Sequence, residues 1–130
     1  MKIVRTEAIP FAIPYAKPLK FASGEVHTAD HVLVRVHTDD GLTGTAEAPP
    51  RPYTYGETQE SIVAVIDKIL APQILGLTAL EREAVQARLD RTVGNPTAKA
   101  AIDMALWTFS ARPPGCRCPD CSAATPTACG

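Results

Sequence analysis

The sequence predicts an α+β fold in which a small antiparallel sheet precedes a group of helices. Two observations carry this prediction. Apolar and polar residues alternate through parts of residues 1–50, which is the period of strands, and from Thr58 apolar residues recur every three or four positions, which is the period of helices. Three expected strands followed by three expected helices indicate that sheet and helices occupy separate layers.

The first expected strand spans residues 2–13. Proline cannot donate a hydrogen bond to a strand ladder, so Pro10 and Pro14 favour an edge position for this strand. Residues 15–30 are expected to form a polar loop, because proline and glycine interrupt the apolar pattern there.

The second expected strand spans residues 31–38 and the third spans residues 42–48. Valines alternate along the second strand on one face, at Val32, Val34 and Val36. Between the two strands, Asp39-Asp40-Gly41 is typical of a hairpin turn, since Asp and Gly tolerate the positive φ that such turns need. The three segments together predict a three-stranded antiparallel meander.

The first expected helix begins either at Thr58 or at the capping box formed by Thr54 and Glu57, and Pro72 is expected to end it. One face of this helix carries the apolar residues expected in the core. They are Ile62, Val65, Ile66, Ile69 and Leu70.

The second and third helices have separate start signals. Thr78, with Glu81 three residues later, predicts a helix that runs to about Thr92 before Gly94. Asn95 is expected to cap the third helix, with proline at its first position. The expected buried face of the third helix is made of small and aliphatic residues, namely Ala98, Ala101, Ile102, Ala105 and Leu106.

Composition and net charge exclude several classes of function. A net charge of −1 over 130 residues and a pI near 6.3 leave no basic surface for nucleic acid and no polybasic patch for a membrane. No apolar run reaches the roughly 20 residues of a membrane span, and the first residues lack the pattern of a signal peptide. Cysteine is absent from residues 1–107, which fits the reducing cytoplasm. We therefore expect a cytoplasmic protein.

The character of the chain changes after Trp107. Residues 108–130 are rich in Pro, Ala and Arg, have no hydrophobic period, and contain all four cysteines, Cys116, Cys118, Cys121 and Cys129. We expect this tail to be disordered. The alternative is a zinc site made by the four thiolates, although only one C-x-x-C pair is present and prolines surround it.

Residues 1–107 resemble the N-terminal domain of the enolase superfamily, in its mandelate racemase/muconate lactonizing branch and nearest to the muconate cycloisomerases. The order of strands and helices carries the resemblance together with two segments, AEAPPRPYTYGETQES and NPTAKAAIDMALW. In that superfamily the second segment continues with an acidic residue and a Pro-hydrophobic-x-x-Leu-Leu-Gly ending, whereas Thr108 follows here.

One lost base at the Trp107 codon would account for the difference. Restoring a G there, with codons typical of GC-rich DNA, turns the tail into DLLGQAAGLPVSRLLGGYTDRMR, which contains the expected ending. We therefore expect residues 1–107 to be the capping domain and residues 108–130 to be an off-frame extension. Sequencing the coding DNA beyond the Trp107 codon tests this expectation.

The resemblance implies a two-part isomerase of aromatic-compound catabolism that interconverts cis,cis-muconate and muconolactone. In such an enzyme this domain caps a C-terminal barrel, and the barrel carries the acid–base lysines and the carboxylates that hold Mg²⁺ or Mn²⁺. The resemblance assigns no catalytic or metal-binding residue to this chain. We expect the chain to be inactive alone and to associate with itself or with the missing barrel.

The resemblance also implies that two loops select the substrate, around residues 17–26 and 49–57. Their candidate residues for a small carboxylate substrate are Lys20, Arg51, Tyr53 and Tyr55. Solvated connecting loops are the alternative for these segments. For the chain as a whole, the alternatives are a stand-alone α+β binding module, the capping domain of a dipeptide epimerase or acylamino-acid racemase, and a small zinc protein.

Overall fold

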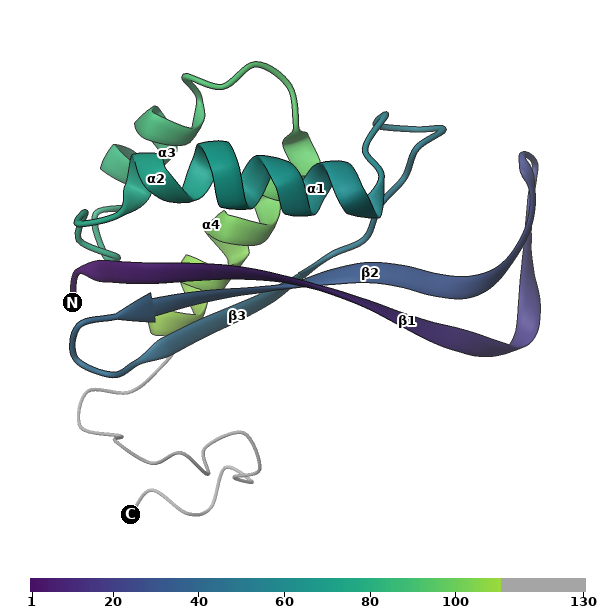
Figure 1. Cartoon of the computed structure of the whole chain (residues 1–130), viewed down its shortest axis with the longest axis horizontal. Coiled ribbons are helices and arrows are strands. Elements are labelled where there is room, and N and C mark those ends of the chain that lie inside the picture. Colours follow the sequence, from purple (N-terminus) through teal and green to yellow (C-terminus); the bar gives the residue numbers. More distant parts are fainter. Residues whose placement is uncertain (111–130) are drawn as a thin grey trace, which may run out of the picture.

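The computed structural model describes residues 1–110. These residues form one sheet with helices on one of its faces (Figure 1). The four cysteines of the predicted tail, and with them the zinc alternative, lie outside the described residues. Disorder predicted from residue 108 onward is wrong for residues 108–110, because the last helix continues to Ser110 and buries Phe109. The elements in chain order are β1 (Ile3–Phe21), β2 (Gly24–Thr38), β3 (Thr43–Ala48), α1 (Gln59–Val65), the π-helical turn η1 (Ile66–Leu70), α2 (Ala71–Ile74), α3 (Arg82–Leu89) and α4 (Pro96–Ser110).

The sheet is the predicted antiparallel meander, in the order β1-β2-β3. The three valines predicted to share one face of β2 are fully buried against the helices. The turn between β2 and β3 forms at the predicted residues, where Gly41 adopts a φ of 81° and the Thr38 N–H donates to the Leu42 carbonyl at 3.0 Å. The edge position predicted for the first strand is also confirmed.

The polar loop predicted over residues 15–30 is wrong. β1 and β2 continue through this segment as a hairpin, paired from Pro14 with Thr28 to Phe21 with Gly24, with a register shift between Pro14 and Leu19. Most of these side chains are exposed, so the pairing of the two strands buries no continuous apolar face. A strand held mainly by backbone pairing shows no hydrophobic period in its sequence.

The first helix begins at Thr58, whose side chain accepts from the Ser61 N–H while the Ser61 hydroxyl accepts from the Thr58 N–H. The predicted end at Pro72 is wrong, because the helical path continues through η1 and α2. Pro72 falls in the first turn of α2, where a missing N–H is tolerated. Ile69, predicted to be buried, is 45% exposed, since a π turn holds an extra residue and rotates that side chain outward.

The predicted start of the second helix is also wrong. Thr78 forms a β-bridge with Lys2 instead, and α3 begins after Glu81. The predicted buried face of the third helix is confirmed, with exposures of 0 to 1%. Asn95 occupies the capping position, but its side chain donates to the Val93 carbonyl and leaves the free amides of α4 to another residue.

The helices pack closely on the sheet where α4 crosses β3. A Cβ atom built on Gly44 would lie 2.2 Å from the Ala105 carbonyl oxygen and 2.9 Å from both the Phe109 ring and the Thr108 hydroxyl. The backbone of β3 therefore touches the backbone of α4, and only glycine fits at this point.

Candidate functional site

A cavity of about 460 Å³ lies between the far half of the β1–β2 hairpin and the segment that joins β3 to α1. Figure 1 shows this hairpin extending past the helices, with its end turned toward that connecting segment. The residues that line the cavity come from both sides, and they are Tyr15, Phe21, Ser23, Val26, Thr28, Ala29, Asp30, His31, Pro50, Arg51, Pro52, Tyr53, Thr54, Thr58, Gln59 and Glu60.

The hairpin forms one wall of the cavity. Its register shift lies between Pro14 and Leu19, and such irregularities bend a strand and increase its twist. Beyond the shift, Phe21 and Val26 line the cavity although they are 53% and 39% exposed. Apolar side chains left this open in a hollow are typical of a binding wall that a ligand or a second domain completes.

The loop around residues 50–57 forms the opposite wall. The carbonyl of Arg51 accepts the N–H groups of Thr54, Tyr55 and Gly56 at 3.1, 2.8 and 3.2 Å. A β-bridge between Arg51 and Glu57 closes the base of the loop, and Gly56 supplies the positive φ of 77° that the turn needs. The loop is therefore a compact unit organised around a single carbonyl.

The floor of the cavity is the junction between the hairpin and α1. His31 lies here, with its Nδ1 hydrogen-bonded to the Glu47 carboxylate and its ring edge-on to Phe11 at a centroid distance of 6.0 Å. Gln59 lies beside it in the first turn of α1. Each residue is held by hydrogen bonds to a neighbouring element, His31 to Glu47 of β3 and Gln59 to the β1 and β2 backbone.

The cavity combines one strong cation with hydroxyl groups and aromatic rings. The Arg51 guanidinium donates one hydrogen bond to the Pro50 carbonyl at 3.1 Å, and the side chain is exposed. A guanidinium presents further donors that match both oxygens of a carboxylate. Asp30 and Glu60 also line the cavity, and their negative charge disfavours an anion on their side of it. The arrangement can orient a small carboxylate with its charged end toward Arg51.

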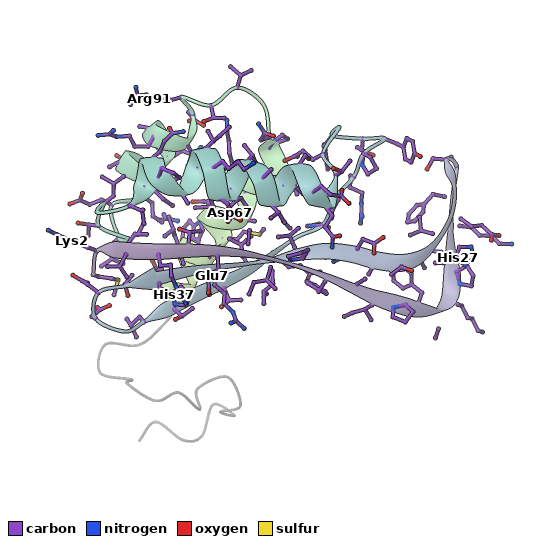
Figure 2. All side chains as sticks on the ribbon, in the orientation of Figure 1. Lys2, Glu7, His27, His37, Asp67 and Arg91 are labelled. Carbon is purple, nitrogen blue, oxygen red and sulfur yellow. The ribbon has the colours of Figure 1, made fainter. Side chains whose placement is uncertain are left out.

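The histidines are distributed over the sheet and do not form a cluster. Figure 2 shows His37 beside Glu7, while His27 lies at the far end of the hairpin. His37 Nε2 donates to Glu7 at 2.6 Å, and this hydrogen bond is the main reason that the pKa of Glu7 lies below its ordinary value. Within residues 1–110 no three His, Cys, Asp or Glu side chains are grouped so that they could hold a metal ion. The described residues therefore do not fit the metal that the resemblance implies.

The structure brings two of the four predicted site residues to the cavity. Arg51 and Tyr53 line it. Tyr55 is 59% exposed on the same loop and does not line it. Lys20 lies at the hairpin end with its side chain 81% exposed, and its Nζ is 3.7 Å from Glu25.

Sequence reasoning missed most of the hairpin wall and the floor. Phe21 lies within the segment 17–26 that the resemblance assigns to substrate selection, but a polar loop predicts no fixed side-chain direction for Phe21 or for Tyr15. The approach of His31 and Gln59 depends on how α1 docks on the sheet, which the sequence does not predict. The signal for this wall in the sequence is the pair of aromatic residues, Tyr15 and Phe21, in a segment expected to be a polar loop.

Three antiparallel strands beneath a layer of helices, with a hollow between a long hairpin and the loop after β3, define an enolase-superfamily N-terminal domain. The chain belongs to the mandelate racemase / muconate lactonizing enzyme N-terminal domain family, whose model matches residues 4–117. No helix within residues 1–110 is long and apolar enough to cross a membrane.

Solved structures and curated relatives agree with this assignment. The muconate lactonizing enzyme from Mucobacterium Smegmatis complexed with muconolactone is 72% identical, with a TM-score of 0.80 over 82% of this chain and 29% of that one. The L-Ala-D/L-Glu epimerase of Bacillus subtilis is 40% identical over 82% of this chain and 30% of its own length. A chloromuconate cycloisomerase of Cupriavidus pinatubonensis is 35% identical over 86% of this chain and 31% of its own length. The chain thus spans under a third of these relatives.

Proposed function

We propose that this chain is the substrate-selecting capping domain of a muconate cycloisomerase-type enzyme and that it is inactive alone. The observation that carries the proposal is the cavity between the hairpin and the Arg51–Glu57 loop, since these two segments are the ones that the family resemblance assigns to substrate selection. The 72% identity to a muconate lactonizing enzyme solved with muconolactone supports this substrate class.

The proposed role follows from the chemistry of the two walls. Arg51 binds one carboxylate of cis,cis-muconate, and Tyr53 covers the unsaturated chain with its ring. Phe21 and Val26 on the hairpin close the other side and exclude water from the substrate. The domain thereby fixes the orientation of the substrate but supplies none of the groups that break or form bonds.

The bond-making groups belong to the rest of the enzyme in this proposal. A barrel domain would supply the acid–base lysines and the carboxylates for Mg²⁺ or Mn²⁺, and a divalent cation held there would stabilise negative charge that develops on the substrate. A related dipeptide epimerase from Cytophaga hutchinsonii was solved with Mg and a dipeptide. The described residues of this chain offer no such group of ligands, so the proposed role of the domain is confined to binding and orienting the substrate.

A dipeptide epimerase is the second candidate, because the Bacillus subtilis L-Ala-D/L-Glu epimerase shares 40% identity with this chain. A cavity that orients one carboxylate suits a dipeptide as well as a muconate. The N-succinyl-L-Arg/Lys racemase of Bacillus cereus, at 30% identity, extends the same alternative to acylated amino acids. The barrel that accepts this domain decides among these substrates.

Two chimeric enzymes test the proposal. Residues 1–107 replace the equivalent domain of the Mucobacterium Smegmatis muconate lactonizing enzyme in one chimera and of the Bacillus subtilis epimerase in the other. We expect turnover of cis,cis-muconate by the first chimera and little epimerisation by the second. The opposite pattern would replace the proposal with the epimerase alternative, and the 130-residue chain serves as the inactive control.

Arg51→Ala in the active chimera should raise KM for muconate by about tenfold to a hundredfold, since a hydrogen bond to a charged group is worth about 1.5–3 kcal/mol. Lys20→Ala is the matched control, because Lys20 lies outside the cavity lining. Equal effects of the two substitutions would show that general attraction of the dicarboxylate, rather than a bidentate contact, governs binding.

The proposal also predicts that the isolated chain associates in solution. Without a barrel, exposed apolar side chains such as Met104 at 46% and Trp107 at 51% lie open on α4. Exposed patches of this kind favour association, so we expect oligomers in size-exclusion chromatography coupled to light scattering. A monodisperse monomer with a sharp unfolding transition would instead favour a stand-alone binding module. One zinc ion per chain in native mass spectrometry would favour the zinc alternative.

A further inference from the structure

We propose that Glu57 and Gln59 are positioning residues that fix the two walls of the cavity relative to each other. They flank Thr58, the residue that caps α1, so both act from the same point of the fold. One holds the loop wall and the other holds the hairpin wall. The inference rests on the proposed function for the identity of the substrate, but the hydrogen bonds that carry it are independent of that identity.

Glu57 is the anchor of the loop wall. It is a charged residue only 4% exposed, and its two carboxylate oxygens accept the N–H groups of Thr97 and Ala98 at 2.8 and 3.1 Å. These amides belong to the first turn of α4, where no backbone carbonyl can accept them and where the helix dipole favours a negative charge. Glu57 therefore does the capping that was predicted for Asn95.

The anchor acts directly on the cavity. The backbone of Glu57 bridges to Arg51, the residue whose carbonyl organises the whole loop. Among the described residues Glu57 forms no ion pair, so the amides of α4 are the partners that hold its charge. Removing a carboxylate from water costs free energy unless hydrogen bonds compensate for the loss. Glu57 meets this condition through α4, and its backbone lies at the base of the loop, so it is well placed to fix that loop.

Gln59 is the anchor of the hairpin wall. Its Nε2 donates to the Phe11 carbonyl at 2.9 Å and to the His31 carbonyl at 2.8 Å. Phe11 and His31 face each other across β1 and β2, so one amide group clamps both strands at the same level. Gln59 is the first residue of α1, so these hydrogen bonds join both strands of the hairpin to the start of that helix. Gln59 therefore sets the angle at which the free half of the hairpin leaves the domain.

The two anchors together determine the width of the cavity. The free hairpin carries Tyr15 and Phe21, and the loop carries Arg51 and Tyr53. A loss of either anchor allows one wall to move while the other stays in place. Substrate size is then discriminated less sharply, since a displacement of about 1 Å in a binding group can change a rate by about a hundredfold.

The tyrosines of the chain provide a direct test. There are three, Tyr15 on the hairpin and Tyr53 and Tyr55 on the loop, so 3-fluorotyrosine labelling reports on both walls in one ¹⁹F spectrum. Glu57→Gln is expected to shift or broaden the resonances of Tyr53 and Tyr55, and Gln59→Glu is expected to affect the resonance of Tyr15. The substitutions conserve size while they remove the carboxylate or the donating amide.

Matched controls make the same chemical changes on α3, where Glu83 is exposed and Gln86 bonds only to Asp90 in its own helix turn. Glu83→Gln and Gln86→Glu should leave all three resonances in place. If the first variants do not fold, Glu57→Asp keeps the charge but shortens the reach of the carboxylate, and Gln59→Met removes the donating amide without adding a charge. Native circular dichroism with three unchanged resonances in the Glu57 and Gln59 variants would overturn the inference.

A kinetic measurement separates this inference from the proposed function. In the active muconate chimera, Glu57→Gln and Gln59→Glu are expected to raise KM by about tenfold with kcat within about threefold, because they disturb binding more than chemistry. An inactive parent chimera contradicts the proposed function but leaves the ¹⁹F result valid. An active chimera whose variants keep the parent KM contradicts the positioning role alone.

Discussion

Gly44→Ala tests the contact on which the two layers of the fold depend. The added Cβ would lie 2.2 Å from the Ala105 carbonyl, whereas ordinary contacts begin at 3.4 Å, so α4 must retreat by roughly 1.2 Å at this point. A gap of about that size forfeits a quarter to a half of the dispersion energy of the facing atoms. The obstructing atom belongs to the backbone, so a change of rotamer cannot relieve the clash.

We expect Gly44→Ala to cost about 3 kcal/mol, at the upper end of the range of about 1–3 kcal/mol for overpacked cores. For a domain of this size that cost lowers Tm by about 12–24 °C. The assay is urea and thermal unfolding followed by circular dichroism and by the fluorescence of Trp107, the only tryptophan of the chain. Thr45→Ala, on the exposed face of the same strand, is the control and should cost at most about 1 kcal/mol. A Gly44→Ala variant within 0.5 kcal/mol of the parent, a limit of about the size expected for surface substitutions, would refute the described packing of α4 on β3.

Two further predictions concern charged surface groups. Arg82→Ala removes a guanidinium that lies 3.2 Å from the centre of the Trp107 ring, and we expect a loss of about 0.5–1 kcal/mol and a shifted fluorescence maximum. The pKa of Glu7 is lowered by its hydrogen bond from His37, so the folded state releases this proton more readily than the unfolded chain. Its stabilising contribution is present above the ordinary pKa of 4.5 and is lost as the pH falls through the lowered value. Glu7→Gln should therefore flatten the acid limb of a plot of urea midpoint against pH, and an unchanged limb would contradict this origin.

Patterns within short segments predicted correctly those parts of the fold that depend on neighbouring residues alone. The alternating valines of β2 gave the buried face of the sheet, and Asp39-Asp40-Gly41 gave the turn, because burial period and positive φ are properties of short segments. The small residues of α4 likewise predicted its buried face. The loop proposed to bind substrate through Arg51 and Tyr53 is predicted by the family resemblance, and no local pattern separates it from a solvated connector.

The two wrong helix-capping predictions share a physical cause, which is competition from a distant partner. Thr78 and Glu81 form a plausible capping box, but a β-bridge to Lys2 holds Thr78 outside the helix. Asn95 is a good capping residue, but the Glu57 carboxylate, from the loop before α1, accepts the hydrogen bonds of the α4 amides. A single sequence shows which residues could cap a helix locally. It does not show whether a group some 40 residues away takes the same hydrogen bonds.

The position of these long-range hydrogen bonds bears on how the domain works. Glu57 ties the loop wall to α4 and Gln59 ties the hairpin wall to α1, so the proposed anchors place each wall on the core and, through the core, relative to the other wall. Under the proposed function, substitutions of other residues that line the cavity can then change substrate selection without unfolding the domain, since the position of each wall depends on its anchor. Variation among relatives named for muconates, chloromuconates and dipeptides should accordingly concentrate in the residues other than Gln59 that line the cavity, while the two anchors retain groups able to accept from α4 and to donate to the strands.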